Sequence, residues 1–231
     1  MESIEAQVFF PKAITITEDH HAFIACHRAV FINYGFIAYL YVVNFLDFNN
    51  AKLITLVELI PYNFGQDGRI INRNTTMSIA LDEQYGIVLV GIPQLDMVIF
   101  STYNETKHLE IFAKQVSDQS GVGFGKSIAL MNGDTYVVLA YAQPTLPWSK
   151  SQIQVYSLDN ISENDRPLYV YPNNQQIIPV INSKPASPTI LTLVSWQEHI
   201  GLVLDVGIAL ILPASPPGRC SSNIQDVLFN I

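Results

Sequence analysis

Two short polar stretches place histidine beside carboxylates, and they are the part of the sequence best suited to chemistry. Glu18, Asp19 and His20 form one stretch, and Glu198 and His199 form the other. The two stretches align without a gap, so that His20 falls on His199. Two histidines with adjacent carboxylates can bind a metal ion or act as acid and base. Polar turns accept the same residues, and repeats place like residues in like positions, so this pattern also suits turns without a catalytic role.

A second stretch imitates a nucleotide site. Residues 120–127 read SGVGFGKS and end like a phosphate-binding P-loop. However, Ser120 replaces the first glycine, and a P-loop must lead into a helix whose N-terminus faces the phosphates. Here the chain reaches the turn signal Asn132-Gly133 after only a few residues. We therefore predict a strand after Ser127 and no nucleotide binding.

The cysteines argue against a zinc site. Cys26 and Cys220 are the only two, and no Cys/His cluster accompanies them. Two buried thiols are the expectation, although the sequence leaves a disulfide between them open. We assign no catalytic residue and no metal ligand, because neither a nucleophile motif nor a ligand cluster is present.

Composition limits the partner classes. Hydrophobic residues make up 49% of the 231 residues and charged residues 14%, with a net charge of −8. Such a chain is too apolar for intrinsic disorder and too acidic for a nucleic-acid partner. The uncharged stretch from Ala29 to Leu46 is rich in Val, Ile, Phe and Tyr and is interrupted by Asn and Gly, so we expect strands there and no membrane span. The start of the chain has no signal-peptide pattern, which suggests a cytoplasmic protein or a fragment of an extracellular one.

The elements that would position these residues form a repeat. Ser78-Ile-Ala-Leu81 recurs as Ser127-Ile-Ala-Leu130, and each is followed by three further apolar runs. These runs are 87–90, 97–100 and 108–112 in the first case, and 136–139, 153–156 and 168–171 in the second. Four strands in about 50 residues match the period of a propeller blade.

The outer parts of the chain follow the same strand pattern. The sequence therefore predicts one domain over residues 1–231, with blade-like units at about 13–62, 76–115, 125–172 and 190–231. The predicted fold class is all-β, either a β-propeller of about four four-stranded blades or part of a larger propeller.

The third unit resembles a known repeat. Gly123-Phe-Gly-Lys-Ser-Ile-Ala-Leu-Met-Asn-Gly-Asp134, followed by Tyr136-Val-Val-Leu-Ala140, resembles the FG-GAP repeats that form the propellers of integrin α chains. The resemblance implies an adhesion-like binding role and calcium loops with several Asp or Asn oxygens. The equivalent turns here offer too few oxygens for a hard cation, so we expect polar hairpin turns and no cofactor.

Three hypotheses about function remain open. The first is a non-catalytic scaffold that binds a protein or carbohydrate through loops on one face. The second is a propeller-fold hydrolase or lyase with a His/carboxylate site on that face, and the third is a propeller fragment with no independent activity. The candidate residues of the ligand face are Asp19, His20, Asp82, Asp134, Glu198 and His199.

Overall fold

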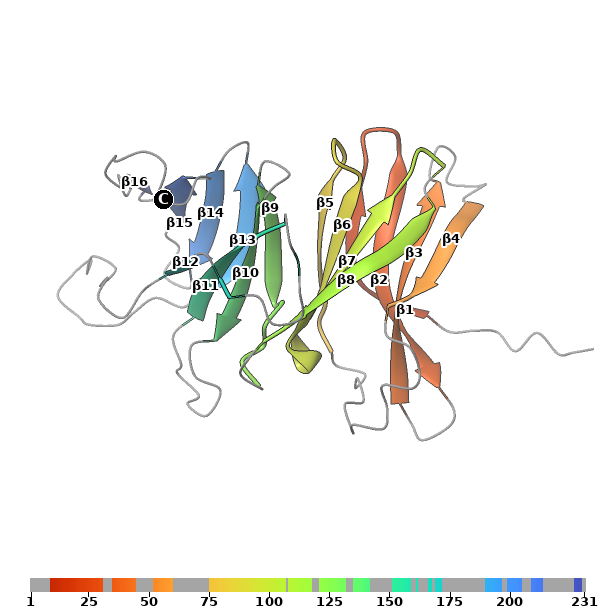
Figure 1. Cartoon of the computed structure of the whole chain (residues 1–231), viewed down its shortest axis with the longest axis horizontal. Coiled ribbons are helices and arrows are strands. Elements are labelled where there is room, and N and C mark those ends of the chain that lie inside the picture. Colours follow the sequence, from red (N-terminus) through yellow and green to blue (C-terminus); the bar gives the residue numbers. More distant parts are fainter. Residues whose placement is uncertain are drawn as a thin grey trace, which may run out of the picture.

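The computed structural model of this chain consists of strands arranged in four separate four-stranded sheets (Figure 1). Every sheet is an antiparallel meander in which strands adjacent in sequence are adjacent in space. The prediction of an all-β fold is confirmed. The structure describes residues 9–30, 35–44, 52–59, 75–106, 108–117, 121–131, 135–141, 151–158, 161, 166–167, 169–171, 190–196, 199–204, 209–213 and 227–229.

We number the sheets in chain order. Sheet 1 contains β1 (Phe9–Ile16), β2 (His21–Val30), β3 (Gly35–Asn44) and β4 (Lys52–Glu58). Sheet 2 contains β5 (Ser78–Asp82), β6 (Ile87–Ile92), β7 (Met97–Tyr103) and β8 (Leu109–Val116). Sheet 3 contains β9 (Ser127–Met131), β10 (Thr135–Tyr141), β11 (Ser151–Ser157) and β12 (Tyr169–Tyr171). Sheet 4 contains β13 (Ile190–Trp196), β14 (His199–Leu204), β15 (Ala209–Pro213) and β16 (Val227–Phe229).

The composition of each strand reflects its place in a sheet. In sheet 2 the middle strands β6 and β7 are almost entirely buried, and their sequences IVLVGI and MVIFSTY are nearly continuous apolar runs. Strands that are covered on both faces require such runs. The outer strand β8 instead alternates between buried and exposed positions. The low charge of the chain therefore follows from how its strands are buried.

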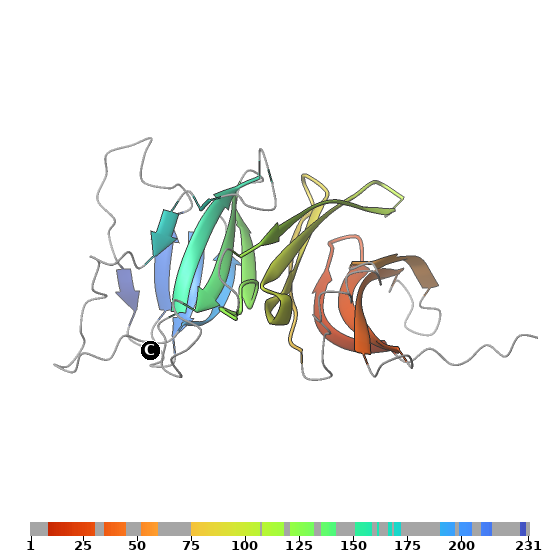
Figure 2. The same cartoon turned by 60° about the horizontal axis from the view of Figure 1, so that its bottom comes forward.

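The four sheets stand side by side in chain order. β1 lies beside β5, β5 beside β9 and β9 beside β13, so the first strands of successive sheets meet. Sheets 1 and 4 lie at opposite ends of this row (Figures 1 and 2). The described sheets thus do not close into a ring, and β16 pairs with β15 at the outer edge of sheet 4.

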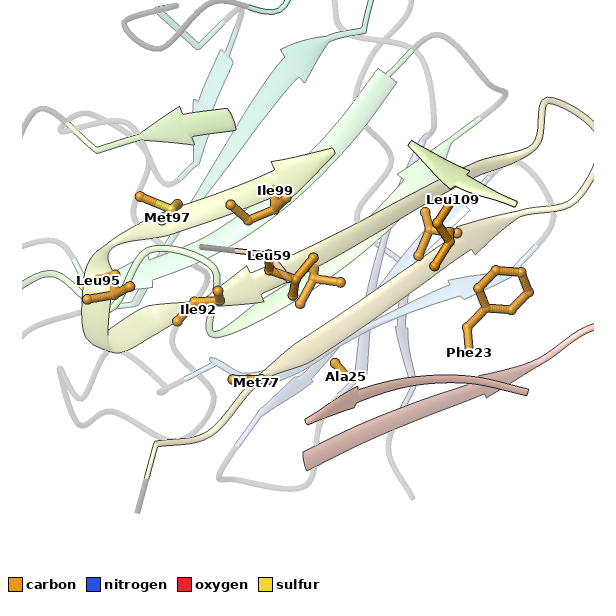
Figure 3. Close-up of a cluster of buried hydrophobic side chains, with 11 residues drawn as sticks. Phe23, Ala25, Leu59, Met77, Ile92, Leu95, Met97, Ile99 and Leu109 are labelled. Atoms are coloured by element: carbon orange, nitrogen blue, oxygen red, sulfur yellow. The ribbon is translucent and has the colours of Figure 1, made fainter. Parts of the chain in front are cut away.

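Two apolar clusters hold the first three sheets together. One joins sheet 1 to sheet 2 and is drawn in Figure 3. Phe23 and Ala25 of β2 contribute to it from one side, and the buried side chains of β6 and β7 contribute from the other. The second cluster joins sheet 2 to sheet 3, where Phe100 meets Tyr136 edge-on at 4.9 Å between ring centroids. Burial of this apolar surface is the main force that keeps the sheets stacked.

A tight junction between sheets 2 and 3 occupies the place of the apparent P-loop. Gly121, Gly123 and Gly125 all have positive φ, and Ser127 then begins β9, as predicted, and not a helix. A Cβ atom added to Gly125 would lie 2.7 Å from Met97 O, and one added to Gly91 would collide with Gly125 O. Only glycine permits this φ and this approach of two backbones. The predicted turn at Asn132-Gly133 lies outside the described residues.

Polar contacts continue the stacking from sheet 3 to sheet 4. The Leu193 N–H donates a 3.1 Å hydrogen bond to Ser127 Oγ, and the Thr192 hydroxyl lies 3.1 Å from the same atom. Ser127 is buried, so its hydroxyl must find a partner within the protein. The first strands of sheets 3 and 4 are joined in this way.

The remaining expectations concern Cys26 and the uncharged stretch. Cys26 is a buried free thiol, and burial raises its pKa to about 12. Cys220 lies outside the described residues. The described part of the stretch from Ala29 to Leu46 belongs to β2 and β3. In the described part of the chain, no helix has the length and apolar character needed to span a bilayer.

Candidate functional site

Two hairpin turns from different sheets meet at one edge of the molecule. The β1–β2 turn of sheet 1 and the β5–β6 turn of sheet 2 both lie at the upper edge in Figure 1. The Glu18 N–H donates hydrogen bonds to both carboxylate oxygens of Glu83, at 3.1 and 3.2 Å. Because a carboxylate held by a backbone donor is fixed in position, the two turns form one surface, which we call the acidic edge.

The β1–β2 turn is organised around Thr17. The His21 N–H donates to the Thr17 hydroxyl at 2.9 Å, and the Thr17 N–H donates to His21 O at 2.9 Å. The Thr17 hydroxyl also bonds the carboxylate of Asp19, and His21 Nδ1 lies 2.9 Å from Asp19 Oδ1. His20 adopts a φ of 64° at the exposed tip. The short polar residues of this stretch are thus used to build a tight turn.

The β5–β6 turn has a similar internal brace. The Tyr85 N–H donates to Asp82 Oδ1 at 3.1 Å, which is the bond expected of an aspartate that starts a turn. Gly86 closes the turn with a φ of 61°, and its carbonyl accepts from the Tyr103 N–H at 2.9 Å. The side chain of Tyr85 is 53% exposed.

Tyr103, the last residue of β7, sits where the two turns converge. Its ring packs against Phe23 of sheet 1 at 4.8 Å between centroids. The pKa of Tyr103 is raised to about 12, first by burial and then by the negative charges of Glu83, Asp19 and Asp82. Carboxylates from both turns therefore act on one phenol, and this phenol stays protonated at neutral pH.

The structure brings together half of the residues proposed from the sequence. Asp19, His20 and Asp82 belong to the acidic edge. His199 is the first residue of β14 in sheet 4, at the opposite end of the row from sheet 1, so the fold does not bring it to His20. Asp134 and Glu198 lie outside the described residues.

Four residues of the acidic edge were not among the candidates of the ligand face: Glu18, Glu83, Tyr85 and Tyr103. Tyr85 lies two residues after Glu83 in the β5–β6 turn, and the turn pattern itself could have drawn attention to it. Tyr103 carries no such signal, because it ends a third strand and reaches the site only through the packing of sheet 1 on sheet 2.

The acidic edge is chemically suited to bind cationic groups. Exposed carboxylates attract Lys and Arg side chains, and an exposed tyrosine ring adds a cation–π partner. The described residues contain no group of three or more His, Cys, Asp or Glu side chains placed to hold a metal ion. The Thr17 hydroxyl bonds the Asp19 carboxylate and accepts from the His21 N–H, and these bonds hold it within the turn. We therefore assign Thr17 no role as a nucleophile beside the His21–Asp19 pair.

The comparisons with known proteins concern the fold and give no function. No family model matches the chain, and no curated protein matches it. A solved structure of a protein from Lactobacillus plantarum superposes with a TM-score of 0.53 at 9% sequence identity, over 95% of this chain and 70% of the bacterial chain. The major Malassezia sympodialis allergen Mala s 1 superposes with a TM-score of 0.47 at 13% identity, over 90% of this chain and 60% of the allergen.

Proposed function

We propose that this chain is a non-catalytic β-propeller scaffold, with its sheets as blades, that binds a protein partner through the acidic edge. The bond between the Glu18 N–H and the Glu83 carboxylate carries this proposal, because it joins turns of two sheets into a single preformed surface. Loops positioned by a rigid scaffold are the usual place for binding residues. The FG-GAP resemblance of the third unit agrees with a binding role.

The partner surface should be basic. The acidic edge offers the carboxylates of Glu18, Asp19, Asp82 and Glu83 together with the exposed ring of Tyr85. The whole chain carries a net charge of −8, which favours the approach of a cationic surface from a distance. Tyrosine is enriched at protein interfaces, where it supplies contact area at a low cost in conformational entropy. A partner that presents Lys and Arg side chains fits this combination.

The test is binding of a defined cationic peptide to the full chain. A fluorescein-labelled peptide of alternating Gly with Arg or Lys is titrated with the protein at low salt, and fluorescence anisotropy reports binding. We expect Asp82→Asn with Glu83→Gln to weaken binding about three- to tenfold and Tyr85→Ala about threefold. Added salt should weaken the wild-type complex, because exposed charges are screened.

Glu110→Gln provides the matched control. Glu110 is an exposed carboxylate on the outer strand β8, so its loss changes the net charge without changing the acidic edge. The proposal requires that this variant bind almost as well as the wild type. A loss for Glu110→Gln as large as that for the double variant would show attraction to the overall charge alone, and retained binding in the double variant would place the site elsewhere; either result overturns the proposal.

A further inference from the structure

The turn between β7 and β8 carries a sequence pattern for a covalent modification. Asn104, Glu105 and Thr106 follow the end of β7, and all three residues are exposed. Asparagine, then any residue except proline, then Ser or Thr is the acceptor sequence for N-linked glycans, and its use requires a surface loop. The β7–β8 turn meets this requirement.

The same pattern occurs twice more in the sequence, in different surroundings. These copies begin at Asn74 and Asn160, which lie outside the described residues. The residue after each of them packs inward, because Thr75 is buried and Ile161 contacts the apolar cluster between sheets 2 and 3. Of the three copies, 104–106 is the one that the structure describes completely, and each of its residues is accessible.

The Asn104 side chain braces the turn through its oxygen. The His108 N–H donates to Asn104 Oδ1 at 3.0 Å, and the Thr106 hydroxyl donates to the same oxygen at 2.7 Å. A backbone N–H can only donate, so the side-chain atom that faces it must be the amide oxygen. The amide nitrogen Nδ2 is the remaining polar atom, and it makes no hydrogen bond to any residue that the structure describes.

This division of roles makes the turn compatible with a modified side chain. A glycan replaces one hydrogen on Nδ2 and leaves Oδ1 as an acceptor, so both bonds to that oxygen can persist. The backbone also closes the turn, because the Asn104 N–H donates to His108 O at 3.3 Å. Attachment of a glycan therefore breaks none of the hydrogen bonds that hold this turn.

We propose that Asn104 is the attachment site of an N-linked glycan. The proposal applies to the chain as part of an extracellular protein, one of the two locations that the sequence leaves open. In the reaction, Asn104 Nδ2 attacks the anomeric carbon of an oligosaccharide carried on a lipid diphosphate. A C–N bond forms, the bond from that carbon to the diphosphate oxygen breaks, the lipid diphosphate leaves with the electron pair, and Nδ2 gives up one proton.

Secretion of the full chain from insect cells behind a cleavable leader tests the assignment. Peptide:N-glycosidase F in H₂¹⁸O converts a glycosylated asparagine to ¹⁸O-labelled aspartate, and mass spectrometry of the peptides reads position 104. A sample without the enzyme gives the background from spontaneous deamidation. We expect label at position 104 in most of the wild-type chains. A secreted chain without label at this position would overturn the proposal, whatever the state of Asn74 and Asn160.

Three variants separate the glycan from the turn that carries it. Asn104→Asp keeps an oxygen acceptor for the His108 N–H and lacks the amide nitrogen, so it should fold and carry no glycan at this position. Thr106→Ser keeps the hydroxyl of the acceptor sequence and should retain the label, whereas Thr106→Val should lose it. Label that persists in Thr106→Val would contradict the proposed use of this sequence.

Circular dichroism supplies a readout of the folded state. The glycosylated wild type and Asn104→Asp should give the same β spectrum, because Nδ2 makes no bond that the glycan would break. A glycosylated chain that lacks this spectrum would show that the turn does not accommodate the sugar, and it would overturn the proposal. Peptide binding at the acidic edge is measured on protein without glycans, so the two proposals fail separately.

Discussion

At the scale of single residues, Asp96 combines an uncommon backbone conformation with three hydrogen bonds that it accepts. It follows the short helix η3 (Pro93–Leu95) and adopts a φ of 51°, a conformation that few residues other than glycine, asparagine and aspartate accept. Its carboxylate accepts from the N–H of Gly121 and, at 3.1 Å, from the N–H of Phe124. Its carbonyl accepts from the Ser117 N–H at 2.9 Å. One buried aspartate thereby fixes the connection from sheet 2 to sheet 3.

Substitution of Asp96 should be among the most destabilising single changes. Asp96→Ala leaves two backbone N–H groups without their charged acceptor and places alanine at a positive φ, so we expect a loss of about 2–4 kcal/mol. Asp96→Asn keeps an acceptor and tolerates the same φ, and it should lose less than half as much. Urea denaturation followed by circular dichroism measures both values. Equal losses for the two variants would contradict this account of the hydrogen bonds.

At the scale of elements, the acidic edge depends on how two hairpins are placed against each other. The β1–β2 and β5–β6 turns belong to different sheets, and the packing of Phe23 against Tyr103 sets their separation. The charges of three carboxylates then raise the pKa of Tyr103 beyond the effect of burial. The ionisation of this phenol consequently reports whether the two turns are together.

Removal of one turn carboxylate should change the titration of Tyr103. Glu83→Gln removes the largest of the charge effects while its amide oxygen can still accept from the Glu18 N–H, so the pKa of Tyr103 should fall from about 12 toward its ordinary value of 10.0. Absorbance of tyrosinate at 295 nm, compared with the same variant carrying Tyr103→Phe, isolates this residue. Glu110→Gln should leave the titration unchanged. An unchanged pKa in Glu83→Gln would mean that the Glu83 carboxylate does not act on this phenol.

The elements were easier to predict than the site. Runs such as 87–90 and 97–100 identify strands because β-branched and aromatic residues recur in short segments between turn signals, and both runs lie in β6 and β7. Asp19 and Asp82 were recognised as turn residues for the same local reason. Tyr103 was not, because only packing between sheets brings it to the carboxylates. The histidine alignment predicted equivalent turns on one face, and the row of sheets places His20 and His199 in sheets at its opposite ends.

At the scale of the whole molecule, burial of titratable groups between the sheets makes the free energy of unfolding depend on pH in alkaline solution. Cys26 is buried in sheet 1, and burial raises the pKa of its thiol from 9.0 to about 12. Above pH 9 the unfolded chain loses this proton while the folded chain keeps it. The free energy of unfolding must therefore decrease as the pH rises from about 9 to 12. Tyr103 acts in the same direction from about pH 10 upward.

The variant Cys26→Ala should flatten this pH dependence. We expect the wild type to lose about 2–3 kcal/mol more than Cys26→Ala between pH 9 and pH 11, since each unit of pKa difference corresponds to about 1.4 kcal/mol. Urea denaturation at a series of pH values gives the two slopes. The slopes, and not the absolute stabilities, are compared, because the lost sulfur atom also changes packing. Parallel slopes would rule out Cys26 as a cause of alkaline instability.

The close approach of Gly91 and Gly125 has a consequence for how this chain can change over time. Each glycine occupies the space that a side chain on the other would need, because a Cβ on Gly91 would meet Gly125 O and a Cβ on Gly125 would lie 3.0 Å from Gly91 Cα. Neither position can vary while the other backbone stays where it is. We therefore expect the two glycines to be retained together during evolution. A substitution at either position requires an earlier change in the backbone path of residues 121–125.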